Sequence, residues 1–287
     1  MRVFKSGVII ILIFYFFSII ADQIFDKKQA EKKFLILSKN MQQHGVSERR
    51  IILYGSSHCD YGLSAQKITV ELNINTINLC NYGVERDKYK NGLLENLLNE
   101  TTENDLIVYS FRLDLEKNQL EEDGILGLLL PQLRVAILKT IKDSLQNDKS
   151  LGDIGDFNKF GDRKYYPRRE KPFNYIDYNI NYELINKDIN EKIYHLLNNE
   201  KLKSNVLFLV TPILIKAKSD INLSKIEFSC TKNICDKFVG LVQPILIDDM
   251  KYFKSIGPRH FNPELGRTLW TSELIGILKK LEKDYLL

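Results

Sequence analysis

The chain has 287 residues, which is long enough for one sizeable domain or for a domain with an insertion. Hydrophobic residues make up 44% of the chain and charged residues 27%, proportions that exclude an intrinsically disordered protein. With 41 basic and 37 acidic residues the formal net charge is only +4, and no basic stripe with interleaved aromatic residues occurs, so the sequence does not predict a nucleic-acid-binding protein.

Residues 1–25 have the pattern of an N-terminal membrane anchor. Arg2 and Lys5 precede an apolar run over residues 7–21 that only Ser18 interrupts, and flanking apolar residues bring the segment near the length of a transmembrane helix. No small-x-small cleavage site is evident, which favours an uncleaved anchor over a cleaved signal peptide. A buried core helix is the other alternative, and it is disfavoured because the run is apolar all round and lies at the extreme N-terminus. Because the positive residues lie before the span, we expect a single-pass protein whose C-terminal part faces away from the cytoplasm.

Residues 26–48 are polar and rich in lysine, and we expect them to form a connector helix between the anchor and a domain over residues 49–287. In that domain, short continuous apolar runs alternate with segments of helical spacing. The predicted strands are residues 50–54, 76–79, 105–110, 206–210 and 245–247, and the predicted helices are residues 64–72, 88–98, 182–198, 233–241 and 263–286, with Ser64 and Asn262 as N-caps. This alternation predicts an α/β fold: a five-stranded parallel sheet in a three-layer α/β/α sandwich.

Residues 120–180 interrupt the alternation and are predicted to form an insertion. Helical spacing returns over residues 124–145, whereas residues 147–178 are polar, rich in Gly, Pro and Tyr, and without a clear period. The stretch is longer than an ordinary connecting loop, which favours a lid or a substrate surface. The basic cluster at residues 163–171 is interpreted as a solvated loop rather than a contact for an anionic polymer.

The four cysteines, Cys59, Cys80, Cys230 and Cys235, do not have the spacing of a zinc site. In an exported domain Cys230 and Cys235 are candidates for a small disulfide loop, while Cys59 and Cys80 are equally well explained as small buried residues. The sequence does not decide this, and nothing in it requires a metal ion or an organic cofactor.

The candidate catalytic residues are sought where the predicted strands end, because ligands bind at the carboxyl ends of the strands in an open parallel sheet. The first strand is followed by G-S-S-H, in which Ser57 is presented in a tight glycine-containing turn. Such a turn exposes a hydroxyl together with backbone N–H donors, as a nucleophile requires. His260, in the loop before the last helix, is the histidine placed to act as its general base.

Two segments resemble a known family. The run I-L-Y-G-S-S-H-C-D-Y-G-L resembles the first block of SGNH (GDSL-like) hydrolases and acyltransferases, especially the membrane-anchored branch that modifies bacterial surface polysaccharides. The run R-H-F-N-P-E-L-G-R-T-L-W-T resembles the family's last block, so the resemblance covers roughly residues 51–275. It implies a flavodoxin-like fold of the SGNH hydrolase type, with Ser57 as nucleophile, His260 as base, and the amides of Ser57 and Gly83 as oxyanion donors.

Two positions depart from the family pattern. The family often has an Asn after the third strand, where this chain has S-F-R; Arg112 is a candidate for positive charge near the oxyanion or substrate, and a surface salt bridge is the alternative. The family's Asp, three residues before the His, is replaced by Gly257. We therefore expect Asp248 or Asp249, or a backbone carbonyl, to orient the imidazole of His260.

The resemblance implies an exported esterase or O-acyltransferase, tethered to the bacterial cell membrane, that acts on acyl esters of cell-envelope or surface polysaccharide. Its expected partners are the membrane, an acylated glycan and a membrane protein of a polysaccharide pathway. The alternative is a catalytically inactive SGNH scaffold that binds envelope glycan or a membrane partner, an interpretation that Gly257 favours. A lipid-ester hydrolase is a third interpretation and would require an apolar groove beneath residues 124–145.

Overall fold

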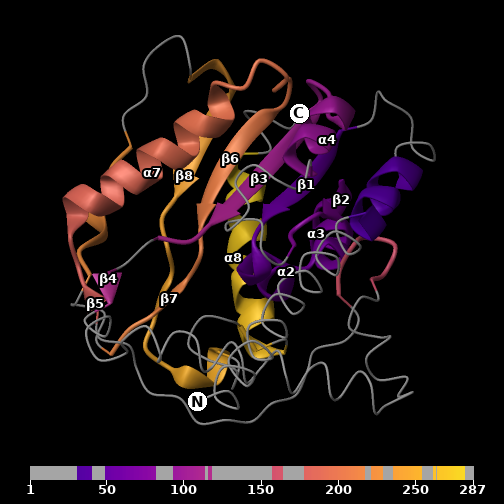
Figure 1. The fold of residues 1–287 in the computed structure, drawn as a ribbon. Helices are drawn as coiled ribbons and strands as arrows, with labels where there is room; N and C mark the ends of the chain where they lie inside the picture. The colour runs from indigo at the N-terminus through magenta and orange to yellow at the C-terminus, as the bar shows by residue number, and fades with distance from the viewer. Residues whose placement is uncertain are drawn as a thin grey trace, which may run out of the picture.

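The structure, a computed structural model, describes residues 31–40, 49–81, 93–113, 116–117, 157–163, 178–216, 221–228, 235–253, 261–262 and 264–281. At its centre lies a five-stranded sheet in which every neighbouring pair of strands is parallel (Figure 1). The strand order is β2-β1-β3-β6-β8, formed by β1 (Arg50–Gly55), β2 (Asn75–Asn78), β3 (Asp105–Phe111), β6 (Asn205–Val210) and β8 (Phe238–Val242). The predicted α/β class with five parallel strands is confirmed.

Helices cover both faces of this sheet (Figure 1). One face carries α2 (Ser57–Gly62), α3 (Ala65–Leu72) and α8 (Leu265–Leu281); the other carries α4 (Leu93–Glu100), α7 (Tyr182–Leu197) and the helix of residues 31–40. Successive strand residues point to opposite faces, so Ile51 and Leu53 join one core and Ile52 joins the other. A strand buried on both faces must be apolar throughout, which explains the continuous apolar runs in the sequence.

The predicted N-caps of two helices are confirmed. Ser64 Oγ accepts a hydrogen bond from the amide of Lys67 in the first turn of α3, at 3.2 Å. Asn262 Oδ1 accepts one from the amide of Glu264 at 2.8 Å, just before α8 begins. Each cap satisfies an amide that has no partner inside its helix, which explains why the helices begin at these positions.

The prediction was wrong between residues 233 and 247. The segment expected as a helix, residues 233–241, contains instead the fifth strand, β8, which pairs with β6. Residues 245–247, expected as that strand, contain β9 (Leu246–Ile247), which pairs with β7 (Ile213–Leu214) in a separate two-stranded sheet. The β8 sequence F-V-G-L-V combines aromatic and β-branched residues with a helix-disfavouring glycine, so local propensity agrees with the observed strand.

The insertion begins and ends at a short antiparallel pair, β4 (Glu116–Lys117) with β5 (Tyr178–Asn179). Within it, residues 157–163 lie along the edge strand β2, where the Asn78 amide donates to the Phe160 carbonyl at 2.7 Å. Gly161 has a φ of 78°, and a Cβ there would lie 2.3 Å from the Asn78 carbonyl oxygen, so only glycine permits this approach. Single 3-10 turns η3 (Leu223–Lys225), η4 (Cys235–Lys237) and η5 (Met250–Tyr252) complete the described elements.

The helix of residues 31–40 falls within the expected connector and is packed into the domain. Lys33, Leu37 and Asn40 are buried, and Asn40 exchanges side-chain hydrogen bonds of 3.2 and 2.6 Å with Asn75 at the start of β2. In the part of the chain that the structure describes, no helix has the length and apolar character needed to cross a membrane. The expected anchor, residues 1–25, lies outside the described residues.

Candidate functional site at the carboxyl edge of the sheet

Ser57 lies at the carboxyl edge of the main sheet, which we define as the edge where β1, β2, β3 and β6 end. It is the first residue of α2, and only Ser56 separates it from Gly55, the last residue of β1, where the chain turns. Gly55 has a φ of 155°, and a Cβ there would lie only 2.3 Å from the Ser110 carbonyl oxygen at the end of β3. Glycine is therefore required for this turn, and the turn delivers Ser57, whose side chain is 7% exposed, to the edge.

Arg112 is the second predicted site residue that the structure describes at this edge. It directly follows β3, and β3 lies beside β1 in the sheet, so Arg112 and Ser57 follow neighbouring strands. Arg112 is half-buried, and its backbone carbonyl accepts a hydrogen bond from Lys192 Nζ of α7 at 2.7 Å. Its proposed contact with an oxyanion stays a prediction.

Asp249, the predicted orienting acid, is engaged by a neighbouring lysine. Its Oδ1 accepts from the Lys251 amide at 3.0 Å, and its Oδ2 forms an ion pair of 2.6 Å with Lys251 Nζ. The hydrogen bond from the Lys251 side chain is the main cause that lowers the pKa of this carboxyl. His260, Gly83 and Gly257 lie outside the described residues, so their expected roles, and that of Asp249 towards His260, stay predictions.

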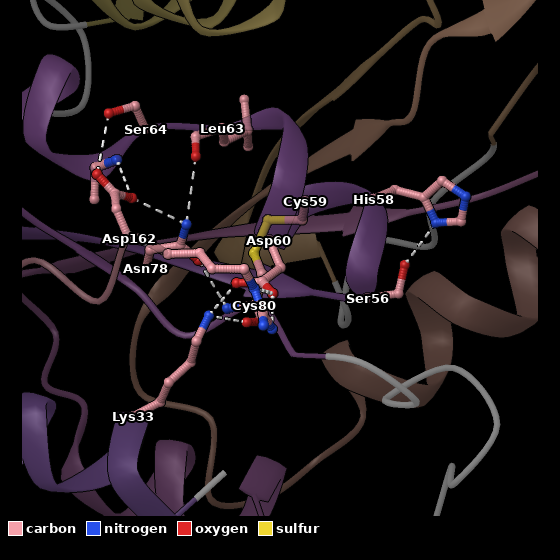
Figure 2. The surroundings of a disulfide bond; sticks show 12 residues. Lys33, Ser56, His58, Cys59, Asp60, Leu63, Ser64, Asn78, Cys80 and Asp162 are labelled. Carbon is pink, nitrogen blue, oxygen red and sulfur yellow. Dashed lines mark hydrogen bonds and ion pairs between the residues drawn. A yellow bond between two sulfur atoms is a disulfide. The ribbon is translucent and has the colours of Figure 1, made fainter. Parts of the chain in front are cut away.

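A buried group of charges lies on one side of α2, around Asp60, and sequence reasoning did not find it (Figure 2 labels Lys33 and Asp60). Asp60, three residues after Ser57, is fully buried and forms an ion pair of 2.5 Å with the equally buried Lys33, from the helix of residues 31–40. The guanidinium of Arg163, from the insertion, lies 2.5 Å from the other carboxylate oxygen of Asp60. We call Asp60, Lys33 and Arg163 the buried charge cluster.

The cluster contains two cations and one anion. Burial alone raises the pKa of Asp60, but the two cations beside it prevail and hold that pKa below its ordinary value. Burial also lowers the pKa of Lys33, while the carboxylate of Asp60 opposes this effect. The Phe157 ring covers both cations, 4.7 Å from Lys33 Nζ and 5.3 Å from the guanidinium carbon of Arg163. Arg163 was expected in a solvated loop, and that prediction was wrong, because its carboxylate partner is in the interior.

An acidic residue of the insertion, Asp162, joins three elements. It accepts hydrogen bonds at the start of α3 from Ser64 Oγ at 3.0 Å and from the Ala65 amide at 2.8 Å. Asn78 Nδ2, at the end of β2, donates to the same carboxylate at 3.1 Å, and Arg267 of α8 lies 3.3 Å from it. The described part of the insertion thus fixes the neighbourhood of α2 and is not a loosely attached surface loop.

A disulfide links α2 to the chain that follows β2 (Figure 2). Cys59 and Cys80 are both fully buried, and their Cα atoms are 5.6 Å apart, a normal separation for a disulfide. The sequence left open whether these cysteines were merely small buried residues, and the structure shows them bonded. Cys235 is disulfide-bonded as well, whereas Cys230 lies outside the described residues.

The C-terminal block packs directly on α2. A Cβ at Gly62 would lie 2.4 Å from Cε3 of Trp270 and 2.9 Å from Cδ2 of Phe261, so glycine is required for the contact between α2 and α8. Phe261 is buried, with its ring 5.5 Å from that of Trp270. The two segments that resemble the SGNH family therefore meet in space, although they lie at opposite ends of the domain sequence.

Ser56 and His58 lie on the other side of α2 from Asp60 (Figure 2). Ser56 Oγ and His58 Nδ1 are 3.1 Å apart, and both side chains are buried.

Over the described ranges, no group of three or more His, Cys, Asp or Glu side chains is placed to hold a metal ion. A comparison of the chain with protein-family models gave no match, and comparisons with curated proteins and with solved structures gave no significant one.

Proposed function

We propose that the protein is an exported, membrane-tethered esterase or O-acyltransferase of the SGNH-like type, which acts on acyl esters of cell-envelope or surface polysaccharide. Ser57 is the nucleophile and His260 the general base. The observation that carries the proposal is the position of Ser57 at the carboxyl edge, on a short buried helix that packs against the C-terminal segment containing Phe261.

The strand order supports a ligand site at this position. Among the five parallel strands, β2-β1-β3-β6-β8 is the order 2-1-3-4-5 of the flavodoxin-like arrangement. In that order the chain leaves β1 towards one side of the sheet and later returns as β3 on the other side, so a crevice opens where β1 and β3 end. Ser57 follows β1 and Arg112 follows β3, on the two sides of this switch point.

The packing of Phe261 supports a role for His260. Phe261 contacts Gly62 at the end of α2, and Gly62 is about 7.5 Å along the helix axis from Ser57, at 1.5 Å per residue. His260 precedes Phe261 in the sequence, and consecutive Cα atoms are about 3.8 Å apart. The proposal requires that the imidazole of His260 extends from beside Phe261 towards the start of α2.

In the proposed reaction the Ser57 hydroxyl attacks the ester carbonyl carbon while His260 accepts its proton. Backbone amides of Ser57 and Gly83 stabilise the oxyanion, and Arg112 adds positive charge beside it. When the tetrahedral intermediate collapses, the alcohol leaves with the proton from His260, and the acyl group remains on Ser57 Oγ. Water then releases a carboxylic acid, or a sugar hydroxyl takes up the acyl group as a new ester, and the hydroxyl of Ser57 is restored.

The disulfides support a location outside the cytoplasm. Cys59–Cys80 is bonded in the interior and Cys235 is bonded too, and such bonds persist in oxidising compartments and are rare in the cytosol. A tethered enzyme outside the cytoplasm meets esters of envelope glycans, so the location and the substrate class are consistent with each other.

We expect Ser57→Ala to abolish both hydrolysis of a chromogenic acetyl ester and covalent labelling by a fluorophosphonate probe, because both require the Ser57 hydroxyl. The full chain is purified in mild detergent, and rates are measured from pH 6 to 9. Ser272→Ala is the matched control, because Ser272 is exposed on α8 and bonds only Lys67 in the described structure. Labelling that persists in Ser57→Ala, or a wild type that is neither labelled nor active at any pH, would contradict the proposal.

Two observations favour a second candidate, a catalytically inactive scaffold that binds envelope glycan. Ser57 is only 7% exposed, and Asp249 is engaged by Lys251. A wild type without labelling that still binds acetylated envelope glycan would select this candidate.

A further inference from the structure

We infer that Lys33 is a positioning residue of the proposed site: from the helix of residues 31–40 it holds Asp60, and thereby α2, the helix that begins with Ser57. The catalytic consequence rests on the proposed function. The mechanical part, that Lys33 restrains α2, does not.

The helix α2 cannot maintain its own orientation. It has six residues, whereas isolated helices shorter than about 12 residues are marginal in water. Its N-cap residue, Ser56, makes no side-chain capping hydrogen bond to the helix. The orientation of α2, and with it that of Ser57, therefore depends on the contacts that the residues of α2 make.

Asp60 is the contact best placed to control Ser57. Residues three apart lie on the same side of a helix, one turn from each other, so a shift of Asp60 moves Ser57 with it. Cys59 and Gly62 also fix α2, but Cys59, two residues from Ser57, does not lie on the same side of the helix as Ser57, and Gly62 lies at the far end of the helix. Among the described contacts of α2, the Ser56–His58 hydrogen bond lies within the first turn, whereas the buried ion pair of Asp60 ties that turn to another element of the fold.

Lys33 ties α2 to a second element of the same edge. Its ammonium binds Asp60 Oδ1 and also donates to the backbone carbonyl of Cys80, which follows β2 (Figure 2). All three groups are fully buried, so no water can substitute for the lysine. Arg163 binds the other carboxylate oxygen of Asp60 and remains when Lys33 is removed. Loss of Lys33 should therefore loosen α2 locally instead of unfolding the domain.

The test compares Lys33→Met with Lys32→Met, an exposed lysine on the same helix, in the full chain. Met has a similar length and no charge. For Lys33→Met we expect the α2 amides to exchange hydrogen at least about tenfold faster, with the amides of α7 unchanged. On the acetyl ester we expect kcat to fall at least about tenfold with KM changed less than about twofold, as for a misplaced nucleophile. Lys32→Met should match wild type, and Lys33→Arg should recover most of kcat.

The outcomes separate this inference from the proposed function. If α2 exchanges faster in Lys33→Met but the wild type has no esterase activity, the proposed function is rejected and the restraint of α2 by Lys33 stands. Unchanged exchange in α2, or equally faster exchange in α7, would overturn the inference whatever the activity. Should Lys33→Met fail to fold, Lys33→Gln, which keeps a donor for the Cys80 carbonyl, is expected to give the same pattern and decides the question by the same criteria.

Discussion

Replacement of Asp60 by Asn is expected to lower the free energy of unfolding by about 3–5 kcal/mol, because it removes the anion from a buried ion-pair cluster. Lys33 and Arg163 would then be two buried cations with no carboxylate between them. The expected effect comes mainly from these uncompensated charges, since an exposed ion pair contributes little. Urea unfolding followed by circular dichroism measures it directly.

Asp249→Asn is the matched control for this substitution. Asp249 also pairs with a lysine, but the pair is exposed, so the unfolding midpoint should stay close to that of wild type. An effect of Asp60→Asn no larger than that of Asp249→Asn would show that the buried charge cluster does not stabilise the fold.

The low pKa of Asp60 predicts where acid weakens the protein. A carboxyl whose pKa is lower in the folded state stabilises the fold at pH values above its unfolded pKa, about 3.9 for Asp. That contribution is lost as the pH falls through the lower folded pKa. The difference in unfolding free energy between wild type and Asp60→Asn should therefore be constant from pH 7 to about 5 and shrink only below about pH 4. A difference that already shrinks between pH 7 and 6 would contradict the assignment of Asp60 as ionised.

The double substitution Cys59→Ala/Cys80→Ala is expected to lower the free energy of unfolding by about 3 kcal/mol, the loop-entropy value for a bond that closes 21 residues. The bond also joins α2 to the chain after β2, so its loss should increase hydrogen exchange in α2. Wild type and the double variant should have similar stability when both are measured in dithiothreitol, which also reduces the bond of Cys235 in each. Equal stability of the oxidised wild type and the double variant would show that the bond is absent or without effect in solution.

The periodicity of the sequence predicts the first four strands of the main sheet and most of its helices, because a strand covered on both faces must be apolar throughout. The fifth strand was misplaced. Residues 238–242 and 245–247 are both short apolar runs, and only pairing with β6, a contact distant in sequence, selects the first. Local propensity permits a strand at residues 238–242 but does not show which of the two runs joins the main sheet.

In the candidate site, too, local sequence predicts some features, whereas contacts between distant residues are not predictable from it. The glycine turn after β1 and the edge position of Ser57 follow from local sequence. The buried charge cluster does not, because Lys33 and Arg163 are 27 and 103 residues from Asp60. Arg163 belongs to a run of basic and aromatic residues that indicates a solvated surface. One signal was available: Asp60 stands three residues after Ser57, inside a short segment otherwise suited to burial, and a buried carboxylate needs a cation.

The most direct test of the proposed site is a crystal structure of the full chain in which the loop around residue 260 is visible. We predict that Ser57 Oγ and the nearer ring nitrogen of His260 lie about 2.6–3.2 Å apart at the carboxyl edge of the sheet, within hydrogen-bonding distance. A His260 side chain at the opposite edge, or one whose two nitrogens both bind other groups, would contradict the Ser57–His260 mechanism.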